Sequence, residues 1–118
     1  MASAASKSEA ADDELARLPT TIVASVRSDS ADVSLRQFAV FLNTYPEQDN
    51  ERTVRGLASA LNISTPAITR ALDRVSALGL IKRERDRIDR RSVIVRRTSA
   101  GATYFRSLDR YLADAART

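Results

Sequence analysis

Two short helical patterns separated by only three residues are the feature that most limits the folds open to this chain. The apolar residues of the first pattern recur at three- and four-residue steps, at Val54, Leu57, Ala58 and Leu61. Thr53 stands before it, where an N-cap belongs, and Asn62 follows it as a residue type that tolerates a left-handed backbone. Helices joined this closely pack at a steep angle, which requires a small side chain such as Ala58 at the crossing.

The second pattern is an amphipathic helix that begins directly after the turn. Thr65 is its expected N-cap, with Ser64 as the alternative, and Pro66 then occupies the first helical position. Gly79 is expected to end the helix. The expected buried face consists of Ile68, Ala71, Leu72, Val75 and Leu78. The exposed face is polar and contains Thr65, Thr69, Arg70, Asp73 and Arg74.

The spacing of these two helices resembles that of a DNA-binding helix-turn-helix. With Val54 as the first position, the fourth, eighth, tenth and eighteenth positions are apolar, at Leu57, Leu61, Ile63 and Ala71. The one departure is Asn62, because a glycine is usual at the ninth position. Ordinary helical hairpins also produce this pattern, and Arg70 and Arg74 would then pair with Asp73 or with solvent. The pattern alone leaves both interpretations open.

The N-terminal half predicts two further helices. One starts at Asp12 and carries apolar residues at Leu15, Leu18, Ile22 and Val26. Pro19 either kinks this helix or opens a second one. The other covers about residues 34–45, with an apolar stripe at Leu35, Phe38, Leu42 and Tyr45. Residues 1–11 are rich in Ala and Ser and predict a disordered tail, so that residues 12–118 form a single domain.

The C-terminal part predicts a β-hairpin and a last helix. Leu80 and Ile81, and then the β-branched run over residues 92–95, favour two strands joined by a charged loop. Thr98 caps the helix, whose apolar residues are Tyr104, Phe105, Leu108, Tyr111, Leu112 and Ala115. The expected fold is therefore mainly α with a small β-hairpin, in the order α-α-α-α-β-β-α.

The net charge of +4 hides a strong asymmetry along the chain. The first 50 residues contain four basic and eight acidic side chains, whereas the remaining 68 contain fifteen basic and seven acidic ones. Residues 82–97 are the most basic stretch, with eight Lys and Arg against three Asp and Glu. A run of this kind is either a solvated surface or a face for a polyanion, so the second half is the candidate binding region.

The absence of cysteine and histidine excludes several classes of chemistry. Disulfides, thiol chemistry and Ser-His triads are ruled out, and the common zinc sites are disfavoured. No pair of carboxylates stands in an apolar context that would tune it for acid-base work. We therefore expect no enzymatic activity, no cofactor and no metal. Met1–Ala11 has no signal-peptide pattern and no apolar run reaches membrane length, so a soluble, cytoplasmic protein is expected.

The stretch from Thr53 to Gly101 resembles the winged helix-turn-helix domain of the MarR family of bacterial transcription regulators. The resemblance rests on Leu57-Ala58, Asn62-Ile63-Ser64, Ile68-Thr69-Arg70, Leu72-Asp73-Arg74, Gly79-Leu80-Ile81 and Asp89-Arg90-Arg91, followed by Val95 and by Thr98 to Gly101. It implies a homodimer, with a recognition helix in the major groove and the hairpin wing in an adjacent minor groove. Arg90 is the implied tip residue, with Arg87 beside it, and Asp89 would orient Arg91. Arg97 departs from the family's usual leucine, so that either the strand end is more exposed or the arginine stem covers the core.

Base and phosphate contacts follow from the side chains of the second helix. Arg70 is suited to a guanine edge and Thr69 to a thymine methyl, while Arg74 is placed for a phosphate. The expected DNA-binding set is Ser64, Thr65, Thr69, Arg70, Arg74, Arg85, Arg87, Arg90 and Arg91. The expected dimer surface, for which burial in the core is the alternative, is Leu15, Leu18, Ile22, Val26, Tyr104, Leu108, Tyr111 and Leu112.

The favoured function is a dimeric regulator, a repressor by expectation, that recognises a pseudo-palindromic site in double-stranded DNA. The alternative is a protein-interaction module, in which the winged helix binds another regulator and the basic face meets an acidic partner. The two differ in salt response, because DNA binding weakens steeply as salt rises. Phe38, Tyr45 and Tyr104 either line a small pocket or pack in the core. The sequence therefore allows a small-molecule effector as a further partner but gives no support for one.

Overall fold

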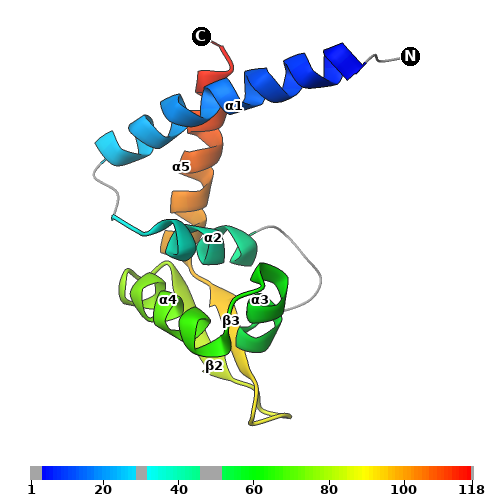
Figure 1. The fold of residues 1–118 in the computed structure, drawn as a ribbon. Helices are drawn as coiled ribbons and strands as arrows, with labels where there is room; N and C mark the ends of the chain where they lie inside the picture. Colours follow the sequence, from blue (N-terminus) through cyan, green and yellow to red (C-terminus); the bar gives the residue numbers. More distant parts are fainter. Residues whose placement is uncertain (1–3, 29–31, 46–51, 118) are drawn as a thin grey trace. The chain divides into compact units, whose positions relative to one another are not determined.

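The chain folds into helices and a small sheet, as Figure 1 shows. We describe it from a computed structural model that covers residues 4–28, 32–45 and 52–117. The elements are α1 (Ala4–Arg27), α2 (Leu35–Thr44), β1 (Arg52–Thr53), α3 (Val54–Leu61), α4 (Thr65–Ala77), β2 (Ile81–Arg85), β3 (Val93–Arg97) and α5 (Ser99–Ala115). The predicted fold, mainly helical with a β-hairpin wing after a helix-turn-helix, is confirmed.

The chain divides into two compact units where the sequence predicted a single domain over residues 12–118. One unit contains residues 33–105 and the other contains residues 1–32 together with residues 106–118. The first unit holds the helix-turn-helix and the hairpin. The second consists of α1 and the C-terminal part of α5, the two segments predicted as terminal helices.

The sheet has three antiparallel strands in the order β1-β3-β2. The predicted hairpin pairs Ile81 with Arg97 and Arg85 with Val93. β1 adds the pairs Arg52 with Val95 and Thr53 with Ile94 on the other edge of β3. This strand was not predicted, because two residues are too few to display the period-two alternation of a strand.

The core of the unit over residues 33–105 lies between α2, α3, α4 and the sheet. Its largest fully buried side chains are Phe41, Leu57, Ile68, Leu72, Val40 and Val75. Phe41 also joins an aromatic cluster, with ring centroids 4.5 Å from Tyr45 and 5.2 Å from Tyr104. Tyr45 and Tyr104, two of the three aromatic residues considered for a pocket, therefore pack against Phe41, while Phe38 is half-buried.

The buried face of α2 differs from the predicted stripe. Of the predicted stripe only Tyr45 is buried, whereas Leu35 is 84% exposed and Phe38 and Leu42 are half-buried. Val40, Phe41 and Thr44 complete the buried face. Both sets recur at helical spacing, so periodicity alone cannot distinguish these rotations of the helix about its axis. Burial of Thr44 costs little because its hydroxyl donates to the Val40 carbonyl at 2.9 Å.

The helix-turn-helix has the caps and the turn that its sequence predicts, with one correction. Thr53 caps α3 by accepting from the Gly56 amide at 2.9 Å, and Asn62 ends it in the left-handed conformation at φ 53° and ψ 47°. The N-cap of α4 is Ser64, which accepts from the Ala67 amide at 3.3 Å; the prediction of Thr65 was wrong. Thr65 becomes the first helical residue, and Pro66 follows within the first turn, where its missing amide hydrogen costs no hydrogen bond.

The unit that contains α1 also corrects one expectation and resolves another. α1 begins at Ala4, so the expected disordered tail over residues 1–11 is wrong from Ala4 onward, and residues 1–3 lie outside the described part. Alanine has the highest helix propensity, which favours a helix in this Ala-rich segment. The helix continues through Pro19. No helix in the described segments is long and apolar enough to cross a membrane.

The hydroxyl of Tyr45 joins three segments that are far apart in sequence. It donates to the Leu80 carbonyl at 2.5 Å and accepts from the Thr98 amide at 3.0 Å. Thr98 in turn donates from its hydroxyl to the Gly79 carbonyl at 2.6 Å and accepts from the Gly101 amide at 3.0 Å, as an N-cap of α5. The end of α2, the start of β2 and the start of α5 are thereby tied together.

We expect Tyr45→Phe to lower the free energy of unfolding by about 1–3 kcal/mol, because it removes the hydrogen bonds to the half-buried backbone groups of Leu80 and Thr98. Tyr111→Phe is the matched control, since its hydroxyl forms no hydrogen bond within the described residues. Urea unfolding of both variants measures the difference. Equal losses of stability in the two variants would contradict the role assigned to the Tyr45 hydroxyl.

Candidate functional site

The exposed face of α4 carries the polar residues that the sequence placed there. Ala67, Ile68, Ala71, Leu72 and Val75 anchor the opposite face in the core. Exposed residues from the predicted set follow along the helix, at Ser64, Thr65, Thr69, Arg70 and Arg74. The Thr69 hydroxyl donates to the Thr65 carbonyl at 3.0 Å, so its donor is already used within the helix. Thr69 therefore offers a methyl group and an acceptor oxygen rather than a donor.

Asp73 connects α4 to the hairpin. Its carboxylate forms an ion pair with the Arg83 guanidinium of β2, at an N to O distance of 2.7 Å. The alternative considered from the sequence was that Asp73 pairs with Arg70 or Arg74 on its own helix. The observed pair links two elements across space, a contact that no local pattern could indicate. It holds the exposed face of α4 in a defined position relative to β2.

Glu84 organises the exposed side of the two hairpin strands. Its carboxylate pairs with Arg96 of β3 at 2.5 Å and with Lys82 at 3.1 Å. Hydrogen bonds from Arg96, and then from Lys82, hold the pKa of Glu84 below its ordinary value. The carboxylate therefore stays ionised at neutral pH and neutralises charge in this part of the strands. Three basic residues of the hairpin strands, Lys82, Arg83 and Arg96, thus have acidic partners inside the chain.

The tip between β2 and β3, residues 86–92, is a turn closed by its own side chains. The Asp86 carboxylate accepts from the Ile88 amide at 2.9 Å. The Asp89 carboxylate accepts from the Arg91 amide at 3.1 Å and from the Ser92 hydroxyl at 3.2 Å. Asp89 was predicted to orient Arg91, and the contact that the structure shows is to the Arg91 backbone. Asp89 therefore shapes the tip itself.

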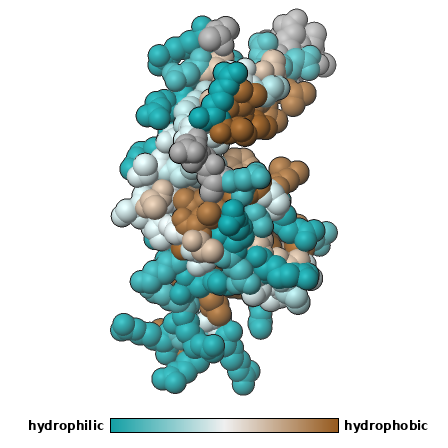
Figure 2. Space-filling model, turned by 90° about the vertical axis from the view of Figure 1, so that its left-hand side faces the viewer, coloured by the Kyte–Doolittle hydropathy of each residue, from teal (hydrophilic) through white to brown (hydrophobic). Residues whose placement is uncertain are grey.

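The arginines of the tip point positive charge outward. Arg85 donates to the Arg90 carbonyl at 2.8 Å, which fixes the base of the turn. Arg87, Arg90 and Arg91 are exposed, and no carboxylate in the described part of the chain pairs with their guanidinium groups. Figure 2 shows hydrophilic side chains projecting at the bottom of the view, where the hairpin lies. Together with Arg70 on α4, these cations form a surface suited to a polyanion.

Two further arginines that the sequence left without a clear role support the frame of this surface. Arg52 of β1 donates to the Asn43 carbonyl at 3.1 Å, and Arg97 of β3 donates to the Thr44 carbonyl at 3.0 Å. Both cations therefore lie at the negative C-terminal end of α2. Arg97 is exposed and caps this helix, and its proximity to residue 44 carried no signal in the sequence.

A second surface is apolar and belongs to the unit that contains α1. Several large apolar residues of α1 are exposed, namely Leu15, Leu18, Ile22, Val23 and Val26. Leu112 of α5 is 46% exposed and Tyr111 is half-buried, whereas Leu108 is buried within the chain. Tyr104 belongs to the other unit, where it is half-buried and lies edge to face against Phe41. Figure 2 shows hydrophobic side chains gathered toward the top of the view.

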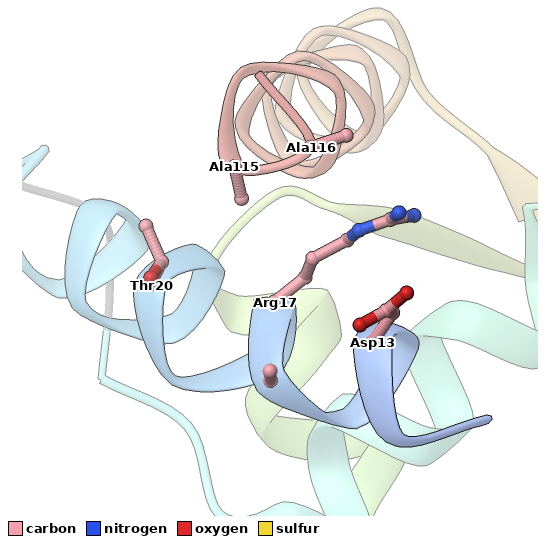
Figure 3. A pocket seen from close by; sticks show the side chains of 6 residues that line it. Asp13, Arg17, Thr20, Ala115 and Ala116 are labelled. Carbon is pink, nitrogen blue, oxygen red and sulfur yellow. The ribbon is translucent and has the colours of Figure 1, made fainter. Parts of the chain in front are cut away.

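A pocket of about 300 Å³ lies in the same unit, and Figure 3 shows the residues that line it. They are Asp13, Ala16, Arg17, Thr20, Ala115 and Ala116. The lining is a carboxylate, a guanidinium and a hydroxyl over small alanine side chains, so it lacks the large apolar walls that drug-sized ligands require. No cluster of His, Cys, Asp and Glu suited to a metal ion is present in the residues described.

A sequence model of the MarR family matches residues 31–92, just over half of the chain. No curated protein matches the chain significantly.

Among solved structures, the MepR–DNA complex of S. aureus aligns at a TM-score of 0.65 and 18% identity, covering 92% of this chain and 79% of that one. A MarR transcriptional regulator from Methanosarcina mazei Go1 aligns at 0.62 and 24% identity, covering 72% of this chain and 60% of that one. Overoxidized AbfR bound to DNA aligns at 0.60 and 24% identity, covering 70% and 59%. The aligned part thus spans about three fifths of the last two proteins. At these identities the likeness concerns the fold.

The ion pair between Asp73 and Arg83 predicts a measurable coupling between α4 and β2. Because both side chains are partly exposed, we expect an interaction free energy of about 0.2–1 kcal/mol that weakens as salt screens it. Urea unfolding of Asp73→Ala, Arg83→Ala and the double variant, at low and high salt, completes the cycle. Strictly additive effects at low salt would show that the two side chains do not interact.

Proposed function

The chain belongs to the MarR family, and from this premise we propose that it is a transcription regulator that binds double-stranded DNA in a sequence-specific manner. The observation that carries the proposal is the pairing, within one compact unit, of an exposed basic helix face and an arginine-rich hairpin tip. The DNA complexes of MepR and AbfR support it, because proteins of the same fold bind DNA.

In the proposed complex α4 enters the major groove with its N-terminal end. Arg70 forms paired hydrogen bonds with a guanine edge, and Thr69 contacts a thymine methyl group. Ser64, Thr65 and Arg74 face the phosphate backbone, which positions the helix without reading the sequence. Support comes from the exposure of all five residues and from the internal hydrogen bond that uses the Thr69 donor.

The hairpin contributes the second set of contacts, in an adjacent minor groove. A narrow, A·T-rich minor groove concentrates negative potential and attracts inserted arginine side chains. Arg90 is the proposed inserted residue, with Arg87 and Arg91 at the groove edges and Arg85 supporting the turn through the Arg90 carbonyl. Asp89 holds the tip in shape through the Arg91 amide and Ser92.

We also propose that the working form is a homodimer on a pseudo-palindromic site. Exposed apolar residues on α1, together with Leu112, favour burial against a second copy of the same surface. The two recognition helices would then reach half-sites about 34–36 Å apart, one turn of DNA. A dimer that covers its site excludes other proteins from the same duplex, so repression is the simplest outcome, in the cytoplasm and without enzymatic activity.

The DNA-binding proposal predicts a steep salt dependence and a specific loss in one double variant. We expect the affinity for a duplex selected from a random library to fall about 10³–10⁵-fold between 50 and 200 mM salt.

Arg70→Ala with Arg90→Ala removes a base contact worth about 1–3 kcal/mol and the groove contact, so specific binding is lost. Fluorescence anisotropy measures both effects.

The matched control removes two positive charges from the other unit. Arg110→Ala with Arg117→Ala lies in the other unit, where Arg110 stacks on Tyr111 and Arg117 pairs with Asp114. This variant should keep its preference for the selected site. Unchanged affinity of the Arg70 and Arg90 variant would refute the proposed readers. If no sequence emerges from the selection, the protein-interaction module replaces the DNA-binding proposal.

The dimer proposal predicts that charges on the exposed face of α1 produce monomers. Ile22→Glu with Val26→Glu adds charges to side chains that are already 49% and 75% exposed, so the fold of one copy should persist. Sedimentation equilibrium at micromolar concentration is expected to give a dimer mass for the wild type and a monomer mass for this variant. Leu35→Glu, at an exposed leucine of α2, serves as the control and should remain dimeric. A monomeric wild type would exclude the dimer.

A further inference from the structure

Ile88 is the most exposed of the large apolar residues described, at 97%. It lies at the hairpin tip between Arg87 and Asp89, two residues before Arg90. Single exposed apolar side chains are common on protein surfaces and need no explanation by themselves. This one differs because it stands in the middle of the most basic turn of the chain.

The backbone around Ile88 is held in one shape. The Ile88 amide donates to the Asp86 carboxylate at 2.9 Å. The turn is closed by hydrogen bonds from the Asp86 amide to the Ser92 carbonyl at 3.0 Å and from the Ser92 amide to the Asp89 carbonyl at 2.9 Å. Isoleucine is also β-branched, which restricts its first side-chain torsion. The tip therefore presents an aliphatic group that loses little conformational freedom when it contacts another surface.

A partner for this tip must accept guanidinium groups and an aliphatic group within a few residues of one another. The minor groove of DNA meets both requirements, because phosphates line its edges while its walls are the C–H surfaces of the deoxyribose rings. Isoleucine is among the apolar side chains that proteins place against base steps in this groove. An acidic protein surface would satisfy the arginines but would leave Ile88 facing hydrated carboxylates.

We infer that Ile88 is the apolar contact of the wing, lying against sugar edges or a base step in the minor groove that Arg90 enters. The inference rests on the proposed DNA binding and adds a residue to it. It assigns to the tip a contribution that does not depend on neutralising phosphates. Arginine contacts weaken with salt through counterion release, whereas burial of an aliphatic side chain does not.

The salt dependence of binding separates the two kinds of contact. We expect Ile88→Ala to weaken binding to the selected duplex about 3- to 10-fold, as partial burial of an isoleucine implies. The slope of log affinity against log salt should remain that of the wild type. Arg87→Ala should instead reduce the magnitude of this slope by about one, as the loss of a phosphate contact does. Ile88→Val, which keeps most of the apolar surface, should restore most of the affinity.

Leu35→Ala is the matched control, because Leu35 is 84% exposed on α2 of the same unit and away from the hairpin. It should bind like the wild type. Hydroxyl-radical footprinting should show that Ile88→Ala loses protection of sugars in one minor groove while the major-groove contacts remain. Folding is checked by urea unfolding, where the exposure of Ile88 predicts no change.

Each result decides between defined conclusions. If the wild type binds the selected duplex and Ile88→Ala binds equally well, or if this variant changes the salt slope as Arg87→Ala does, the inference is overturned and the proposed function stands. If the wild type binds no duplex, both fail. A loss of affinity at constant slope, with the footprint changed only at the wing, supports the inference.

Discussion

The frame of this protein depends on a buried hydroxyl group. Tyr45 bonds to Leu80 at the start of β2 and to Thr98 before α5, and Thr98 returns a hydrogen bond to Gly79 at the end of α4. A side chain at Gly101 would collide with the Tyr45 hydroxyl and the Leu80 carbonyl, so the approach of α5 requires glycine there. Since β2 begins directly after Leu80 and Gly79 follows the C-cap of α4, this network fixes the end of α4 relative to the start of the hairpin.

Within this frame the many arginines fall into two groups with different tasks. Arg52 and Arg97 cap α2, and Arg83 and Arg96 are paired with carboxylates across the surface. The guanidinium groups of these four residues bind partners within the protein itself. The outward group, Arg70, Arg87, Arg90 and Arg91, lies on α4 and at the hairpin tip, and it carries the proposed contacts with DNA. Net charge alone overstates the number of cations that a polyanion would meet.

The local parts of this arrangement were predictable from the sequence. Thr53, Asn62 and Gly79 lie where their backbone preferences placed them, and α4 buries the expected face. Errors arose where two local solutions were nearly equivalent. Ser64 and Thr65 are both good caps, and the choice depends on which oxygen reaches the Ala67 amide. The apolar face predicted for α2 was rotated relative to the observed one. The observed face buries Thr44, which is possible because its hydroxyl forms a hydrogen bond within the helix. β1 was too short to leave a pattern.

The sequence by itself determined the helix-turn-helix, the basic hairpin and the residue types that face outward from them, because caps, turns and amphipathic periods act over a few neighbouring residues. Only the tertiary structure decided which charged side chains bind partners within the protein and which face outward. The pairs Asp73 with Arg83 and Thr44 with Arg97, and the contacts of Tyr45, join residues far apart in the chain. No local pattern encodes such contacts, since they arise only when packing of the core brings separate elements to hydrogen-bonding distance.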